Sequence, residues 1–192
     1  IYTPAIADDN LFLKYFRTNG NNSIFKRSEI LGEISKQSKC IAVAGTHGKT
    51  TTTAIISHLF HSSGIHFKAF IGGIMKCFDS NYINTGNDYI IVEADEYDRS
   101  FLNLDPNYAV ITSIENDHLD VYGDFKSLTK SFQSFANNVK DVLITEAKID
   151  IDKDFSFSIK SDSDYYVNNI KILDNGIRSV SYTHLRAHET LS

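Results

Sequence analysis

Residues 45–51, GTHGKTT, contain the residue types that can bind a chain of phosphates. They follow an apolar run and precede a helical pattern, so backbone N–H groups and a helix N-terminus would surround an anion. Lys49 could reach phosphate oxygens, and Thr50 could offer a hydroxyl to Mg2+. A standard loop, G-x-x-x-x-G-K-[ST], needs glycine at Val43, but the first glycine is Gly45. The sequence therefore predicts a nucleotide site with a shortened loop.

Acidic side chains follow a second apolar run, in VEADEYDRSF (92–101): Glu93, Asp95, Glu96 and Asp98. A carboxylate at a strand end beside a phosphate loop is a typical protein ligand for Mg2+ that bridges nucleotide oxygens. We select Glu93, because it lies inside the end of the strand, whereas the other acids lie in the loop. The alternative interpretation is an acidic loop that is simply solvated.

A histidine follows a third apolar run, in SIENDHLDVYG (113–123). His118 lies between Asp117 and Asp120 and could be a metal ligand or a base; a solvated or packed histidine is the alternative. We expect the histidines of the first helix and just after it at the surface, and we assign no metal role to the i, i+4 pair near the C-terminus: His58, His61 and His66, then His184 and His188.

Strand and helix patterns alternate along the chain. Short β-branched runs, typical of strands buried in a parallel sheet, occupy residues 40–45, 88–95, 108–114 and 141–146. Helical periodicity occupies two stretches. In 49–63 we expect Ile55, Ile56, Leu59 and Phe60 on the buried face, and in 124–138, capped by Asp124, we expect Phe125, Leu128, Phe132 and Phe135. This order predicts an α/β fold, with ligands at the carboxyl ends of the strands.

Composition excludes several classes of function. The 192 residues carry a formal net charge of −5 with no basic run, so we expect no nucleic-acid or membrane partner. No apolar run approaches the length of a membrane span. Two cysteines without metal-ligand spacing, Cys40 and Cys77, fit free thiols in the cytoplasm. The sequence gives no oligomeric state.

Together and in this order, GTHGKTTT, VEADEYDRSF and IENDHLDVYG resemble the central ATP-binding domain of the Mur ligases of peptidoglycan synthesis, whose loop is shortened in the same way. The resemblance implies a P-loop-type fold, a mostly parallel sheet with helices on both faces, incomplete in this chain. YTPAI and FKRSEILGEI resemble the end of the family's N-terminal, UDP-binding domain. We therefore expect the end of that domain in residues 1–36, a truncated central domain in 37–178 and a non-native tail in 179–192.

The resemblance also implies the roles of the site residues, with ATP and Mg2+ as cofactors. Lys49 would contact the β and γ phosphates and Thr50 the first magnesium. Glu93 would ligate magnesium and His118 a second metal, so that Lys49, Glu93 and His118 are the expected catalytic residues. The residues expected to hold the ATP phosphates are Gly45, Thr46, His47, Gly48, Lys49, Thr50 and Thr51.

The implied reaction joins L-alanine to UDP-N-acetylmuramate through an acyl phosphate, with both molecules as substrates; we expect residues 1–192 alone to be inactive. Several sister ligases carry a carbamoylated lysine where this chain has Gln133, with Lys130 three residues earlier, which favours the alanine-adding branch. Ser113 replaces an asparagine of many relatives. The alternatives are the ligase that recycles an intact tripeptide, more remotely a folylpolyglutamate synthase, and a P-loop protein that is not a ligase.

Overall fold

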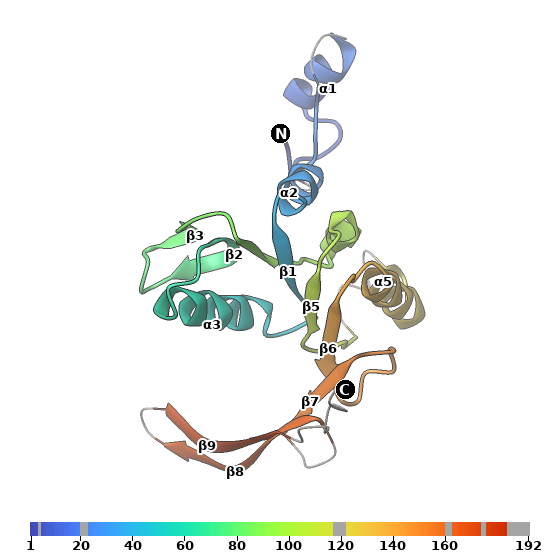
Figure 1. Cartoon of the computed structure of the whole chain (residues 1–192). Helices are drawn as coiled ribbons and strands as arrows, with labels where there is room; N and C mark the ends of the chain where they lie inside the picture. Colours follow the sequence, from blue (N-terminus) through green and yellow to red (C-terminus); the bar gives the residue numbers. More distant parts are fainter. Residues whose placement is uncertain (4, 20–22, 117–121, 160–162, 174–175, 184–192) are drawn as a thin grey trace, which may run out of the picture.

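The computed structural model describes residues 1–3, 5–19, 23–116, 122–159, 163–173 and 176–183. The strands of this part of the chain form one sheet in the order β3-β2-β4-β1-β5-β6-β7-β8-β9 (Figure 1). Neighbouring strands from β2 to β8 are parallel, whereas β3 and β9 pair antiparallel at the two edges. The strands are β1 (Lys39–Ala44), β2 (Phe67–Met75), β3 (Ser80–Asn84), β4 (Tyr89–Glu93), β5 (Tyr108–Ile111), β6 (Val142–Glu146), β7 (Phe155–Ser158), β8 (Tyr165–Leu173) and β9 (Gly176–Thr183).

Helices cover both faces of this sheet, which confirms the predicted fold class. Alternate residues of β1 point to opposite faces. Cys40 belongs to a core cluster with Phe132 of helix α5, whereas Ile41 belongs to a second cluster against which Phe60 of helix α3 packs. The helices are α1 (Leu11–Thr18), α2 (Arg27–Ser35), α3 (Lys49–Ser62) and α5 (Phe125–Asn137), with a 3-10 helix, η1 (Tyr97–Asn103).

The predicted buried face of α3 is partly wrong. Ile55 and Leu59 are 54% and 57% exposed, whereas Thr53 and Ser57 are completely buried. These two side chains are small, and each hydroxyl donates a hydrogen bond to the carbonyl four residues earlier, at 2.8 Å. Because their polar atoms are satisfied within the helix, they can pack closely on the sheet.

The predicted cap and most of the predicted face of α5 are confirmed. The Asp124 side chain accepts a hydrogen bond from the backbone N–H of Ser127 at 2.6 Å. Leu128, Phe132 and Phe135 are buried, but Phe125 at the first turn is 46% exposed, because it lies at the rim of the sheet beside a cavity.

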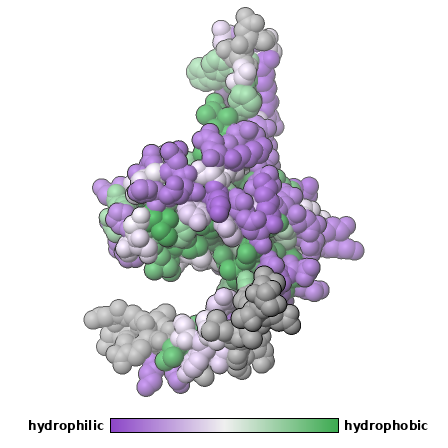
Figure 2. Space-filling view, in the orientation of Figure 1, coloured by the Kyte–Doolittle hydropathy of each residue, from purple (hydrophilic) through white to green (hydrophobic). Residues whose placement is uncertain are grey.

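The two ends of the chain extend away from the central sheet (Figure 1). Apolar side chains of α1 lie on the surface in Figure 2, and Leu11 and Phe12 are 80% and 76% exposed. At the other end, β9 crosses the expected boundary at residue 179, so residues 179–183 belong to the sheet. The domain boundaries and the origin of the tail stay predictions, and His184 and His188 lie outside the described residues.

Candidate nucleotide site

The shortened loop joins β1 to α3 and is bent at two glycines. Gly45 and Gly48 have φ angles of 131° and 83°, in the left-handed region that favours glycine. A Cβ atom on Gly45 would also lie 2.1 Å from Oγ1 of Thr112, which follows β5. That hydroxyl donates to the carbonyls of Ala44 at 3.0 Å and His47 at 2.5 Å. The end of β5 therefore supports the loop from below.

Residues after β5 also bind the loop backbone. The N–H of Thr46 donates to the Ser113 carbonyl at 3.0 Å, and the N–H of His47 donates to Ser113 Oγ at 3.0 Å. The Glu115 N–H donates to Thr46 Oγ1 at 2.9 Å. Ser113 thus holds the loop backbone through both its carbonyl and its hydroxyl. The His47 and Glu115 side chains are exposed, with His47 Nε2 3.7 Å from Glu115 Oε2.

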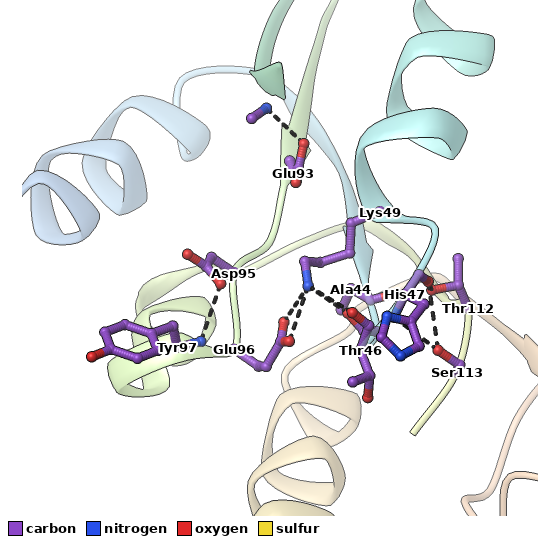
Figure 3. A network of polar contacts seen from close by, with 12 residues as sticks. Ala44, Thr46, His47, Lys49, Glu93, Asp95, Glu96, Tyr97, Thr112 and Ser113 are labelled. Atoms are coloured by element: carbon purple, nitrogen blue, oxygen red, sulfur yellow. Dashed lines mark hydrogen bonds and ion pairs between the residues drawn. The ribbon is translucent and has the colours of Figure 1, made fainter. Parts of the chain in front are cut away.

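The Lys49 ammonium lies across the mouth of the loop and contacts a residue that the sequence analysis did not select (Figure 3). It donates to the Gly45 carbonyl at 2.7 Å and to both carboxylate oxygens of Glu96, at 2.7 and 3.0 Å. The Glu96 side chain is completely buried, and that of Lys49 is 13% exposed. Glu96 was visible in sequence only as one of four acids, and its position in the loop gave no signal that it is buried.

Glu93 lies at the end of β4 as predicted, and its carboxylate is fixed from two sides. Thr50 Oγ1 donates to Glu93 Oε1 at 2.8 Å, and the backbone N–H of Gly72, on β2, donates to Oε2 at 2.6 Å. The structure therefore brings together Lys49, Thr50 and Glu93. A hydroxyl and a carboxylate side by side at the end of a phosphate loop are hard oxygen ligands of the kind that Mg2+ prefers.

The remaining predicted ligand, His118, lies outside the described residues. Among the described residues, no three His, Cys, Asp or Glu side chains group closely enough to hold a metal ion by themselves. The predicted surface positions of His58, His61 and His66 are confirmed.

Tyr122, the aromatic residue of the third motif, reaches back into the site. Its hydroxyl donates to the Glu96 carbonyl at 2.5 Å, and its side chain is buried. Burial, together with the nearby Glu96 carboxylate, raises the pKa of Tyr122 to about 12. The phenol therefore stays a neutral hydrogen-bond donor at physiological pH.

A cavity of about 630 Å³ opens beside the loop, at the carboxyl ends of β5, β6 and β7. Its walls combine apolar side chains with Ser113, Glu115, Glu146 and Lys148. Because it borders the residues that support the loop, a molecule bound there would lie next to a phosphate held by the loop. Its volume lies within the range of small-molecule sites.

The fold and this loop define the class of protein: an α/β nucleotide-binding domain with a P-loop-type anion site at the carboxyl end of a central strand. The sequence profile of the Mur ligase middle domain matches residues 43–189. The chain therefore belongs to the Mur ligase family.

Within this family, the chain is similar to ligases that have been named for their substrates. The chain is 40% identical over 189 residues to the UDP-N-acetylmuramate–L-alanine ligase of Cytophaga hutchinsonii, covering 92% of this chain and 40% of that protein. It is 45% identical over 174 residues to the ligase of the same name from Christiangramia forsetii, covering 90% and 38%. The crystal structure of the alanine ligase MurC from Thermotoga maritima matches with a TM-score of 0.83 at 26% identity, over 94% of this chain and 43% of that one. The chain thus spans about 40% of the length of the curated relatives it matches.

Within the described residues, no helix is both long and apolar enough to cross a membrane.

Proposed function

We propose that the protein carrying these residues is an ATP-dependent ligase that joins L-alanine to UDP-N-acetylmuramate. The observation that carries this proposal is the 40–45% identity, over at least 90% of the chain, to ligases named for these two substrates. The two cysteines, one buried and one exposed, are free thiols, in keeping with a reaction in the cytoplasm.

The geometry supports phosphoryl transfer from ATP to the muramate carboxylate. Lys49 is the single lysine of the loop and the first residue of α3, and its ammonium lies 2.7 Å from the Gly45 carbonyl, close to the helix N-terminus that would attract phosphate oxygens. It would neutralise charge on the transferring group, with the loop residues Gly45 to Thr51 holding the phosphates in line. In such a reaction, positioning and electrostatics carry the rate.

Thr50 and Glu93 would hold a magnesium ion between the loop and β4. Their oxygens lie 2.8 Å apart, and both are hard ligands, so the residues present fit this ion. When bound, Mg2+ supplies positive charge to the phosphate oxygens. We assign a second metal to His118 on the resemblance of its motif alone. His47, whose ring is exposed beside Glu115, has no assigned role beyond its backbone contacts to the loop.

The test is phosphate release by the protein expressed from the full reading frame that contains these residues. ATP, Mg2+ and UDP-N-acetylmuramate would be supplied with either L-alanine or the stem tripeptide. We expect release that depends on L-alanine. Release only with the tripeptide would move the assignment to the recycling ligase, and release with neither acceptor would contradict a ligase function.

A further inference from the structure

The Glu96 side chain is completely buried, and its carboxylate contacts Lys49, the lysine of the loop. Both of its carboxylate oxygens lie within 3.0 Å of Lys49 Nζ. Taking two charges out of water is costly, and a buried ion pair often adds no stability over apolar residues of similar volume. A contribution to stability alone therefore does not explain this buried ion pair. The positions of its atoms say more about its role.

The segment that carries Glu96 is held in one conformation. The Glu96 carbonyl accepts hydrogen bonds from the Tyr122 hydroxyl at 2.5 Å and from the Arg99 N–H at 2.9 Å. Asp98 and Arg99 have φ angles of 53° and 56°, which are unfavourable for residues other than glycine. Such backbone persists only where its surroundings fix it. Here Lys26 Nζ lies 2.9 Å from Asp98 Oδ2, and the Arg99 guanidinium lies 5.5 Å from the centre of the Tyr122 ring.

The three sequence motifs therefore meet at one residue. Glu96 belongs to the second motif, its side chain binds Lys49 of the first, and its carbonyl binds Tyr122 of the third. The contacts span 47 and 26 residues of sequence, so none of them is a consequence of local helix or turn geometry.

We infer that Glu96 is a positioning residue that holds the Lys49 ammonium at the mouth of the phosphate loop. This inference rests on the proposed function, in which Lys49 contacts the phosphates of ATP. Lysine has a flexible stem and three rotatable donors, so its direction must be set by its acceptors. The two contacts at 2.7 Å, to the Gly45 carbonyl and to Glu96 Oε2, anchor the ammonium. The longer contacts, to Glu96 Oε1 at 3.0 Å and to the Thr46 carbonyl at 3.4 Å, are those that a phosphate oxygen would replace.

Lys49 is one of several groups that would bind ATP. The loop N–H groups and the N-terminus of α3 would share that binding, so the direction of the lysine side chain matters less for holding ATP than for the reaction. As negative charge shifts during phosphoryl transfer, a lysine held in line stabilises the transition state, and only this differential interaction raises kcat. Glu96 should therefore influence kcat more than the KM for Mg-ATP.

The first experiment compares Glu96→Gln with the unchanged protein, both made from the full reading frame. The amide keeps the size of the side chain but removes the charge and replaces one of the two acceptor oxygens by an NH2 group, which cannot accept from the ammonium. We expect kcat for phosphate release to fall about 10- to 100-fold, a range typical for removal of a residue that orients a functional group. The KM for Mg-ATP should change by less than about threefold, because ground-state binding depends little on this pair. Glu33→Gln, an exposed acid of α2, is the matched control and should leave both constants unchanged.

The second experiment does not depend on the ligase reaction. Urea unfolding midpoints would be measured for Glu96→Gln, Lys49→Met and the double variant. Lys49→Met alone leaves a buried carboxylate without its lysine and should lower the midpoint strongly, whereas adding Glu96→Gln should restore much of the loss.

The two experiments separate the possible failures. Unchanged kcat in Glu96→Gln would overturn the inference, and so would additive shifts of the unfolding midpoint, because Glu96 would then not act through Lys49. A protein that shows coupled midpoints but no phosphate release with L-alanine would contradict the proposed function and leave the Lys49–Glu96 anchor supported.

Discussion

The Thr50 hydroxyl and the Glu93 carboxylate lie 2.8 Å apart, although 43 residues separate them in sequence. The parallel register of β1 with β4 places the end of β4 beside the start of α3, and Val43 is the residue of β1 that pairs with Glu93. A hydroxyl and a carboxylate thus meet at the edge of the sheet where an α/β fold binds its ligands.

This pair predicts how the proposed ligase reaction depends on the magnesium concentration. Glu93→Gln keeps the volume of the side chain but removes the charge that would ligate the metal. We expect the Mg2+ concentration for half-maximal phosphate release to rise by at least about tenfold. A magnesium titration at saturating ATP measures the effect, with Glu33→Gln as a control. An unchanged titration curve would exclude Glu93 as a ligand.

A second prediction concerns Gly72, because a side chain at this position would clash with the same Glu93 carboxylate. A Cβ atom at this position would lie 2.7 Å from Glu93 Oε1, and the backbone N–H of Gly72 holds Oε2. Gly72→Ala should therefore lower the free energy of unfolding by about 1–3 kcal/mol, as overpacking does. In a Glu93→Ala background the contact is gone, so the same change should cost little. Urea denaturation of the four proteins tests this coupling, and equal costs in both backgrounds would contradict it.

Much of the fold could be predicted from local patterns. The β-branched runs predicted β1, β4, β5 and β6 within a few residues, and Asp124 marked the start of α5. No element was predicted for residues 67–84, which form β2 and β3. In that stretch the apolar pattern is interrupted by Gly72 and Gly73. The contact of Gly72 with Glu93 depends on the pairing of β2 with β4, which the sequence does not show.

The sequence indicated those site residues whose role follows from their type and local motif. It did not indicate residues whose role depends on contacts between distant segments. Lys49, Thr50 and Glu93 follow from a loop pattern and a strand end. Glu96 was one of four acids of the same segment and was not selected, because burial of a loop carboxylate depends on a partner 47 residues away. The buried face of α3 was misjudged for a related reason, since Thr53 and Ser57 satisfy their own hydroxyls and need no water.

Lys49 predicts the largest loss of turnover. Lys49→Arg keeps a positive charge opposite Glu96, so the fold should survive, but the planar guanidinium cannot occupy the position of the ammonium. We expect kcat for phosphate release to fall about 100- to 1000-fold, as when a donor to the transition state is lost. Circular dichroism checks the fold, and Lys130→Ala, an exposed lysine of α5, serves as the control. Activity within a few-fold of the unchanged protein would refute a role for Lys49 in phosphoryl transfer.

The buried thiol of Cys40 and the buried phenol of Tyr122 predict that the protein loses stability in alkaline solution. Burial raises the pKa of the Cys40 thiol from 9.0 to about 12, and burial also raises the pKa of Tyr122 to about 12. Each group makes its full stabilising contribution below its unfolded pKa, which is 9.0 for Cys40 and 10.0 for Tyr122. Above that pH the unfolded chain releases a proton that the folded chain retains, so the contribution is lost progressively as pH rises toward 12. Each group contributes a slope of at most about 1.4 kcal/mol per pH unit.

Urea unfolding between pH 8 and pH 11 measures this slope, and Cys40→Ala should make it shallower while Tyr122 retains its share.

The same burial predicts thiol reactivity. At pH 8 a disulfide reagent should modify the exposed Cys77 at once and Cys40 only after unfolding, because Cys40 is 0% exposed and its thiol stays protonated. Equal rates for the two thiols in the folded protein, or an unchanged slope in Cys40→Ala, would show that Cys40 ionises as it does in the unfolded chain.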